Sequence, residues 1–191
     1  MLRRSSAGSL PSQHGLFVMR LNPFQWSFRV QCFAVFAACA GVISFALFSQ
    51  MYWDLLPCPL CIFQRIAFAA LGLVALIAGL HAPKGALGRR VYGVLALIAG
   101  GTGIGIAGRH VQLTTLPPDK VPACGPPLQF MVDNNPFGDM VKMVLTGSGE
   151  CAKVDWTFLG LSMPAWSLVW FVALTLFALS AAFKRRAVSS P

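Results

Sequence analysis

Two cysteines separated by two residues stand at the start of an apolar stretch. The motif Cys58-Pro59-Leu60-Cys61 is followed one helical turn later by Arg65, and the stretch carries no other charge. A vicinal dithiol exchanges electrons with other thiols, and a nearby cation favours the reactive thiolate. Zinc needs four ligands, and this stretch offers no second C-x-x-C or His pair. The pattern therefore favours redox chemistry at a membrane surface, with no metal.

The elements that must position this motif are membrane-spanning helices. Of the 191 residues, 56% are hydrophobic and 11% are charged, whereas an average soluble domain has about 25% charged residues. Four apolar runs are long enough to cross a bilayer as helices, and none alternates as barrel strands do. They are residues 30–50, 62–80, 91–108 and 163–183. We expect an all-α membrane protein, a four-helix transmembrane bundle with a long, partly irregular periplasmic loop.

The basic residues predict the side that each connection faces. Ten of the 15 Lys and Arg lie in the N-terminal tail 1–29, between the second and third spans, and in the C-terminal tail 184–191. Basic segments stay cytoplasmic, so both termini are expected there. All six acidic residues lie in the connections 51–61 and 110–162, which are expected on the opposite side. The net charge of +9 is then a topology signal and requires no nucleic-acid partner.

The N-terminal tail is not expected to be a cleavable signal peptide. Its first 18 residues are polar and rich in Ser and Gly, and Met19 is an alternative start. The first span is therefore expected to target the protein to the membrane.

Four of the six cysteines fall in the outward-facing connections. Cys58 and Cys61 lie in the short one, and Cys124 and Cys151 lie in the long one. Disulfides persist in oxidising compartments such as the bacterial periplasm. Taken alone, the distant pair is best interpreted as a structural disulfide, worth about 3.5 kcal/mol for a separation of 27 residues. Beside a C-x-x-C we favour thiol exchange, because the prolines around Cys124 predict an extended segment that a partner can reach.

Arg65 and His110 are expected at the same depth below the outer surface. Each stands at the outer end of a span, and Arg65 shares a helix face with Cys61, four residues before it. Repeated oxidation of a dithiol needs an external acceptor for two electrons and two protons. A lipid-soluble quinone can accept them at the bilayer edge. Arg65 would stabilise the Cys61 thiolate and the quinone oxygen, and His110 would donate a hydrogen bond or a proton from the other side of the ring.

Some other patterns are assigned no chemistry. Residues 103–108 match G-x-G-x-x-G, but no strand precedes them. Gly101 and Gly105 instead predict a small-residue face that a neighbouring helix approaches closely. Cys32 and Cys39 are about 10.5 Å apart along a helix, too far for a disulfide, and are expected to be buried thiols. Apolar residues within 128–144 predict a short helix on the membrane surface.

Several segments together resemble the DsbB family of bacterial inner-membrane disulfide-forming oxidoreductases. They are CPLCIFQR at 58–65, AGRH at 107–110, the loop containing Cys124 and Cys151, and FLGLSMPAW at 158–166. The resemblance covers the chain from about residue 22 onward. It includes the spacing of four cysteines, Arg65 and His110, and is therefore far more specific than a C-x-x-C alone.

The resemblance implies a function and a role for each cysteine. Cys124 would form a mixed disulfide with the periplasmic dithiol oxidase DsbA, with Cys151 as its partner in the loop. Electrons would then pass to Cys58 and Cys61. Cys61 would lie next to the quinone, which is ubiquinone, or menaquinone under anaerobic conditions. Reoxidation of DsbA in this way sustains disulfide formation in secreted proteins.

The same resemblance assigns Arg65 and His110 to the quinone site. Gln64 stands where some members of the family carry an acid, so the site is expected to lack a local carboxylate. Proton delivery is then the part of the mechanism that the sequence leaves open.

Two other classes of protein share some of these features. A vitamin K epoxide reductase-like enzyme also combines a membrane C-x-x-C with a quinone, but there the motif is expected near the end of the bundle sequence, whereas here it opens the second span. A non-enzymatic membrane assembly protein would use the loop cysteines as a structural disulfide. Such a bond resists mild dithiothreitol, while a catalytic pair exchanges readily.

Overall fold

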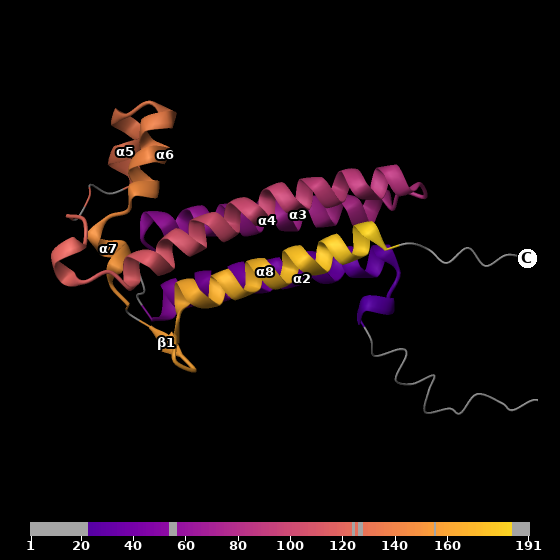
Figure 1. Cartoon of the computed structure of the whole chain (residues 1–191), viewed down its shortest axis with the longest axis horizontal. Coiled ribbons are helices and arrows are strands. Elements are labelled where there is room, and N and C mark those ends of the chain that lie inside the picture. Colours follow the sequence, from indigo (N-terminus) through magenta and orange to yellow (C-terminus); the bar gives the residue numbers. More distant parts are fainter. Residues whose placement is uncertain (1–22, 54–56, 124, 126–127, 155, 185–191) are drawn as a thin grey trace, which may run out of the picture.

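Four long helices lie side by side and make up most of the protein (Figure 1). The computed structural model describes residues 23–53, 57–123, 125, 128–154 and 156–184. All four helices are long and apolar enough to cross a membrane, which confirms the predicted fold class. Each contains one of the predicted spans. They are α2 (Phe28–Tyr52), α3 (Pro59–His81), α4 (Ala86–Thr114) and α8 (Met163–Phe183).

The local sequence explains where α3 begins and ends. Cys58 is the N-cap residue, and Pro59 takes the first helical position, where its missing N–H costs no hydrogen bond. The helix ends at His81; the next residue, Ala82, is the C-cap with a left-handed φ of 42°, and Pro83 follows. A proline at that place cannot continue the helix. The C-x-x-C motif is therefore the first turn of α3.

Three glycines of α4 let α8 approach closely. A Cβ atom at any of them would overlap a side chain of α8, so only glycine fits. They are Gly93 against Ala182, Gly100 against Thr175, and Gly103 against Phe171.

The prediction that Gly101 and Gly105 form the packing face of α4 was wrong. A Cβ at Gly101 or Gly105 would meet nothing within 4 Å. Successive helical residues are turned by about 100°, so Gly101 points away from the face that Gly100 and Gly103 present to α8. The sequence contains glycines on both faces, and only the partner helix distinguishes them.

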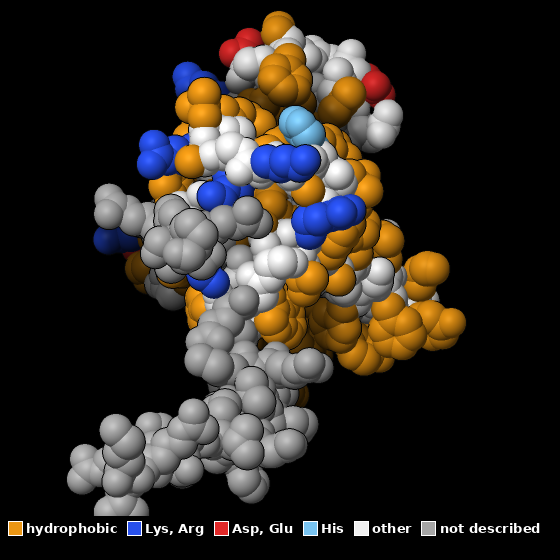
Figure 2. All heavy atoms as spheres, turned by 90° about the vertical axis from the view of Figure 1, so that its right-hand side faces the viewer, with side chains coloured by type: hydrophobic (Ala, Val, Ile, Leu, Met, Phe, Trp, Pro, Cys, Tyr) orange, Lys and Arg blue, Asp and Glu red, His pale blue; other side chains and the backbone are white. Residues whose placement is uncertain are grey.

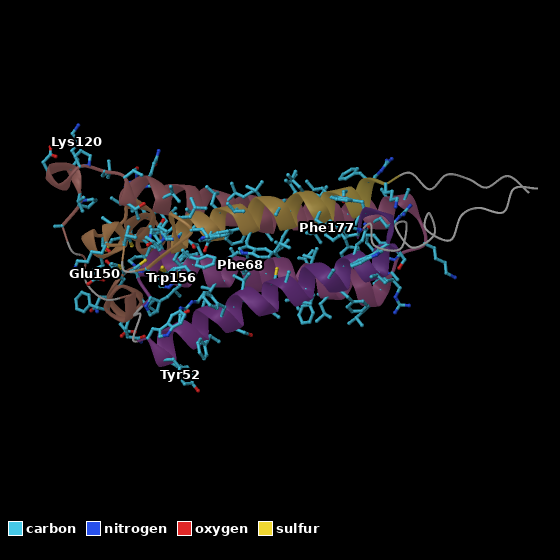
Figure 3. All side chains as sticks on the ribbon, turned by 90° about the horizontal axis from the view of Figure 1, so that it is seen from below. Tyr52, Phe68, Lys120, Glu150, Trp156 and Phe177 are labelled. Atoms are coloured by element: carbon cyan, nitrogen blue, oxygen red, sulfur yellow. The ribbon has the colours of Figure 1, made fainter. Side chains whose placement is uncertain are left out.

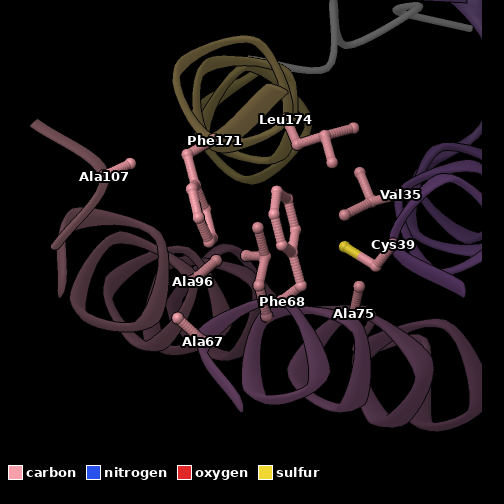
Figure 4. Close-up of a cluster of buried hydrophobic side chains, with 10 residues drawn as sticks. Val35, Cys39, Ala67, Phe68, Ala75, Ala96, Ala107, Phe171 and Leu174 are labelled. Atoms are coloured by element: carbon pink, nitrogen blue, oxygen red, sulfur yellow. The ribbon is translucent and has the colours of Figure 1, made fainter. Parts of the chain in front are cut away.

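The bundle core is built around two stacked aromatic rings (Figure 4). Phe68 of α3 and Phe171 of α8 lie 3.7 Å apart between ring centroids, with an interplanar angle of 11°. Cys39 of α2 packs in the same cluster and is 1% exposed, and Cys32 is also buried. Both are free thiols, as the sequence predicted.

The short elements after α4 gather at one end of the bundle (Figure 1). The single predicted surface helix over 128–144 is in fact two helices, because Pro136 interrupts it. Met131, Met140 and Val144 are buried within this region and do not face outward. The elements are η2 (Pro118–Lys120), α5 (Leu128–Asn134), α6 (Phe137–Thr146), α7 (Gly149–Ala152), β1 (Thr157–Phe158) and β2 (Leu161–Ser162).

Basic side chains collect at the opposite end, seen face-on in Figure 2. This end also holds the short helix η1 (Pro23–Gln25). The basic residues of the two terminal tails at 1–22 and 185–191, and Met19, lie outside the described residues. The described ones stand at helix termini: Arg29, Lys84, Arg89, Arg90 and Lys184.

Neighbouring glycines of α4 provide a matched test of this packing. Gly100→Leu should destabilise the bundle by about 1–3 kcal/mol, because the added side chain must displace Thr175 and separate α4 from α8. Gly101→Leu should unfold close to wild type, since that position is open. Thermal unfolding in detergent measures both, and equal melting temperatures for the two variants would contradict the assigned packing face.

Candidate redox-active site

The C-x-x-C motif holds its two sulfur atoms close together in the first turn of α3. The Cys58 Sγ accepts a hydrogen bond from the backbone N–H of Cys61 at 3.4 Å. The two Sγ atoms lie 3.2 Å apart as free thiols. A disulfide bond is about 2.05 Å long, so a small movement joins them without unwinding the helix.

The long connection brings Cys151 back to this motif. The Sγ atoms of Cys58 and Cys151 and a ring nitrogen of His110 all lie within 4.8 Å of one another. A hydrogen bond with the Cys58 thiol is the main cause that lowers the pKa of the Cys151 thiol to about 5, while burial opposes it and backbone groups of Leu60 and Ser148 add to it. The same hydrogen bond raises the pKa of Cys58. In the reduced form this hydrogen bond favours the thiolate at Cys151 and the thiol at Cys58.

Apolar contacts hold the loop that carries Cys151. Gly147 ends α6 with a φ of 88°, and a Cβ there would overlap Leu113 at the end of α4, so the turn requires glycine. The cluster that joins this loop to the bundle consists of Leu60, Ile106, Leu113, Met131, Met140, Val144 and Cys151. We call it the docking cluster. It places α7 directly over the start of α3.

The segment that leads to the fourth predicted cysteine is also tied to α7. The backbone N–H of Gly149 donates to the carbonyl oxygen of Ala123 at 3.2 Å. Cys124 itself lies outside the described residues. Ala123, the residue before Cys124, is therefore hydrogen-bonded to Gly149, which lies two residues before Cys151 in the sequence.

His110 lies inside α4 rather than at the start of the long connection. The helix continues to Thr114, so its last five residues belong to the predicted connection 110–162. His110 is 3% exposed. Its Nδ1 lies 3.0 Å from the Gln64 amide nitrogen, and its Nε2 lies 3.7 Å from the Cys58 Sγ. Because an amide NH₂ group can only donate, Nδ1 is the acceptor, and the ring proton is on Nε2, facing Cys58.

Arg65 is held by α2 rather than by the thiols. Its guanidinium donates to the Gln50 Oε1 at 2.7 Å and to the Ala46 carbonyl oxygen at 3.2 Å. A cation within a membrane span requires such partners, since an unsatisfied charge in hydrocarbon is costly. Arg65 and Cys61 both line one cavity, so the helix face that the sequence assigned to them opens into it.

This cavity lies between α2, α3, α8 and residues 150–158 and has a volume of about 870 Å³. Most of its wall is apolar or aromatic, including Phe45, Phe68 and Trp170. Cys61, Gln64, Arg65 and His110 add polar groups to this wall. Glu150 and Lys153 also line it, so the expected lack of a local carboxylate was wrong. An apolar cavity with a few convergent polar groups is the usual form of a small-molecule site.

Aromatic residues surround the loop side of the cavity. Trp53 and Trp156 stack with centroids 6.4 Å apart, and Trp156 stacks on Phe158 at 5.9 Å. The indole N–H of Trp166 donates to the Phe158 carbonyl oxygen at 3.0 Å and fixes the β1–β2 hairpin. Figure 3 shows Trp156 and Glu150 at the end where α2 terminates at Tyr52, with Phe68 farther along the bundle.

The structure brings most of the sequence-predicted site residues together. Cys58, Cys61, Cys151 and His110 meet around one point, and Arg65 lines the adjoining cavity. Sequence reasoning missed Gln50 as the partner of Arg65 and Ser148, whose Oγ lies 3.7 Å from the Cys151 Sγ. Gln50 had a signal, because it is a polar residue in the last turns of an apolar span.

Comparisons with known proteins agree on one family. The model of the family described as "Disulfide bond formation protein DsbB" matches residues 28–181. Disulfide bond formation protein B of Xanthomonas euvesicatoria pv. vesicatoria is 55% identical over 167 residues, which cover 87% of this chain and 96% of that protein. The protein of the same name from Xylella fastidiosa (strain 9a5c) is 48% identical over 86% of this chain and 95% of its own length.

The matched region contains α2, α3, α4 and all but the last two residues of α8, together with the C-x-x-C motif and the loop that carries Cys151. High identity over nearly the full length of these relatives leaves no large part of the fold unaccounted for. The chain therefore belongs to the DsbB family of disulfide bond formation proteins.

Proposed function

We propose that this protein is a membrane thiol oxidoreductase that reoxidises a periplasmic DsbA-type dithiol oxidase and passes the electrons to a membrane quinone. One observation carries the proposal: the Cys58–Cys61 pair stands between the Cys151 thiol and an apolar cavity that contains Arg65. Thiols on one side of the pair can exchange with a protein partner. The cavity on the other side suits a lipid-soluble acceptor.

The sulfur contacts suggest the order of exchange. A reduced partner attacks Cys124 of a Cys124–Cys151 disulfide, which forms a mixed disulfide and releases Cys151 as thiolate. Cys151 then attacks Cys58 of the Cys58–Cys61 disulfide, because Cys58 is the sulfur within its reach. This step forms a Cys58–Cys151 bond and releases Cys61 as thiolate. Each step exchanges one disulfide for another, so two electrons move toward Cys61.

The second thiol of the partner completes the exchange. It attacks its own mixed disulfide with Cys124, and the partner leaves oxidised. The released Cys124 thiolate can then displace Cys58 from Cys151, which restores the loop disulfide. Cys58 and Cys61 remain as a dithiol that carries the two electrons and faces the cavity.

The residues around the cavity fit a quinone. The Arg65 guanidinium can donate to a ring oxygen while α2 holds it in place, and the aromatic wall suits a flat ring and an apolar tail. A bound quinone supplies an acceptor for two electrons and two protons. The proposed acceptor is ubiquinone under aerobic conditions and menaquinone under anaerobic conditions. His110 and Gln64 supply the hydrogen-bond donors at the thiol side of this site.

The orientation in the bacterial inner membrane follows from the charges at the two ends of the bundle. The end with Arg29, Lys84, Arg89, Arg90 and Lys184 would face the cytoplasm together with both termini. The end that carries the thiols would face the periplasm, where oxidised cysteines persist. The partners are then a DsbA-like protein in the periplasm and the quinone pool of the bilayer.

Quinone reduction tests the proposal directly. The purified protein, given a reduced DsbA-type protein and a short-chain ubiquinone analogue, should bleach the quinone absorbance at a steady rate. Cys151→Ser should abolish turnover, because the exchange partner of Cys58 is lost. Cys61→Ala should still capture the soluble partner but accumulate the mixed disulfide on non-reducing gels. Cys32→Ala, a buried thiol away from the site, is the control and should turn over normally; normal turnover of Cys61→Ala would overturn the relay.

Arg65 gives a second prediction. A charge-assisted hydrogen bond is worth about 1.5–3 kcal/mol, so Arg65→Met should raise the Michaelis constant for quinone roughly ten- to a hundredfold. Arg65→Lys should recover only part of this, since it restores the charge but not the planar fork. The exchange step with the soluble partner should be unchanged, and Arg90→Met at the far end serves as control. If Arg65→Lys were silent and Arg65→Met merely unstable, Arg65 would be an anchor to lipid phosphate.

Gln64 gives a third prediction, on the proton of His110. In Gln64→Glu a carboxylate would accept from Nδ1–H and favour the charged imidazolium. The wild-type ring should be the Nε2–H tautomer by ¹⁵N NMR of labelled histidine, and the variant should carry a proton on Nδ1. The pH profile of turnover should change in Gln64→Glu, while Gln112→Glu near the end of α4 should leave it as in wild type. An Nδ1–H tautomer in the wild type would contradict the assigned hydrogen bonds.

A further inference from the structure

The site contains more metal-ligand atoms than its redox chemistry requires. Cys58 Sγ, Cys151 Sγ and a ring nitrogen of His110 lie within 4.8 Å of one another. The Cys61 Sγ lies 3.2 Å from that of Cys58. The sequence argument against zinc assumed that ligands come in pairs close along the chain. The fold instead supplies His110 from α4 and Cys151 from α7 to the C-x-x-C of α3.

The distance between the Cys58 sulfur and the His110 ring suits a tetrahedral ion. With Zn–S bonds of about 2.3 Å and a Zn–N bond of about 2.0 Å, tetrahedral ligands lie about 3.8 Å apart for two sulfurs and about 3.5 Å for sulfur and nitrogen. The Cys58 Sγ lies 3.7 Å from the His110 Nε2. Cys151 completes three ligands, and Cys61 is the nearest thiol for the fourth position. Three thiolates and one imidazole form a common zinc ligand set.

We propose that the fully reduced protein binds one zinc ion through Cys58, Cys151 and His110, with Cys61 in the fourth position, and that this ion blocks the exchange of disulfides. The three thiols lose their protons to solvent when the ion binds, and no electron moves. Sulfur atoms in disulfides have no thiolate to offer, so only the reduced form binds. The bound centre has one net negative charge, and the cavity wall carries the cations Arg65 and Lys153. Zinc therefore competes with the oxidation of the dithiol.

Gln64 is the residue that supports this ligand set. For Nε2 to bind the ion, the ring proton must move to Nδ1, where it needs an acceptor. Gln64 is 4% exposed and lies 3.0 Å from Nδ1. Rotation of its amide by half a turn presents the oxygen instead of the nitrogen. The same residue can thus support either tautomer of His110.

Cobalt provides a spectroscopic probe of the site in the full-length protein in detergent. Co²⁺ added to reduced protein without oxygen should bind at one equivalent, with the thiolate-to-cobalt and d–d absorption of a tetrahedral site, and Zn²⁺ should displace it. Oxidised protein should give no such spectrum. Cys151→Ser and His110→Ala should each weaken Zn²⁺ binding at least tenfold, whereas Cys32→Ala should not.

Gln64→Glu separates this proposal from damage to the fold. A carboxylate that accepts from a ligating histidine strengthens the site, and such supporting residues change metal affinity by about 10- to 100-fold. Gln64→Glu should therefore bind Zn²⁺ more tightly, and Gln64→Leu more weakly. Equal affinity of wild type, His110→Ala and Cys151→Ser would overturn the proposal and assign binding to the C-x-x-C alone. Loss of binding in Cys124→Ser but not in His110→Ala would also overturn it. These measurements use neither quinone nor a protein partner, so their failure leaves the proposed function standing.

Discussion

The apolar contact between the loop and the end of the bundle is the constraint on which the rest of the site depends. Cys58 stands at the start of α3 and Cys151 lies in α7, and the docking cluster brings them together. A fully buried side chain of the size of Leu113 or Met131 contributes about 1.5–3 kcal/mol. Several such contacts, and a glycine turn at Gly147 that admits no side chain, hold α7 over the first turn of α3. Thiol exchange requires sulfur atoms in contact, so this packing is part of the proposed chemistry.

A second requirement is that the cation of Arg65 be stable within an apolar cavity wall. Arg65 uses the side-chain oxygen of Gln50 and the carbonyl oxygen of Ala46, so its charge is compensated by α2. These bonds also link α2 to α3 beside the cavity. The cavity can therefore remain apolar enough for a lipid-soluble molecule while it presents a fixed positive charge near the thiols.

The sequence predicted the features that depend only on neighbouring residues or on the thickness of the bilayer. A span must be apolar over a fixed length, so all four helices were found, and C-P-L-C has the form of a helix start. The register of α4 against α8 could not be predicted, because glycines such as Gly100 and Gly101 occur on both faces. The contact of Cys151 with Cys58 depends on how a long loop returns, which spacing along the chain does not encode. The sequence argument against zinc was limited for the same reason, because it considered only ligands that are close along the chain.

The N-cap of α3 has a consequence for the helix itself. The Cys61 N–H donates a hydrogen bond to the Cys58 sulfur, and in the proposed exchange that atom is in turn a thiol, a thiolate and part of a disulfide. A charged acceptor makes a hydrogen bond roughly twice as strong as a neutral one, and a cap contributes about 0.5–2 kcal/mol to its helix. The order of the first turn of α3 and the oxidation state of Cys58 are therefore thermodynamically linked. Oxidation or reduction of Cys58 would therefore also change the stability of the first turn of a membrane-spanning helix.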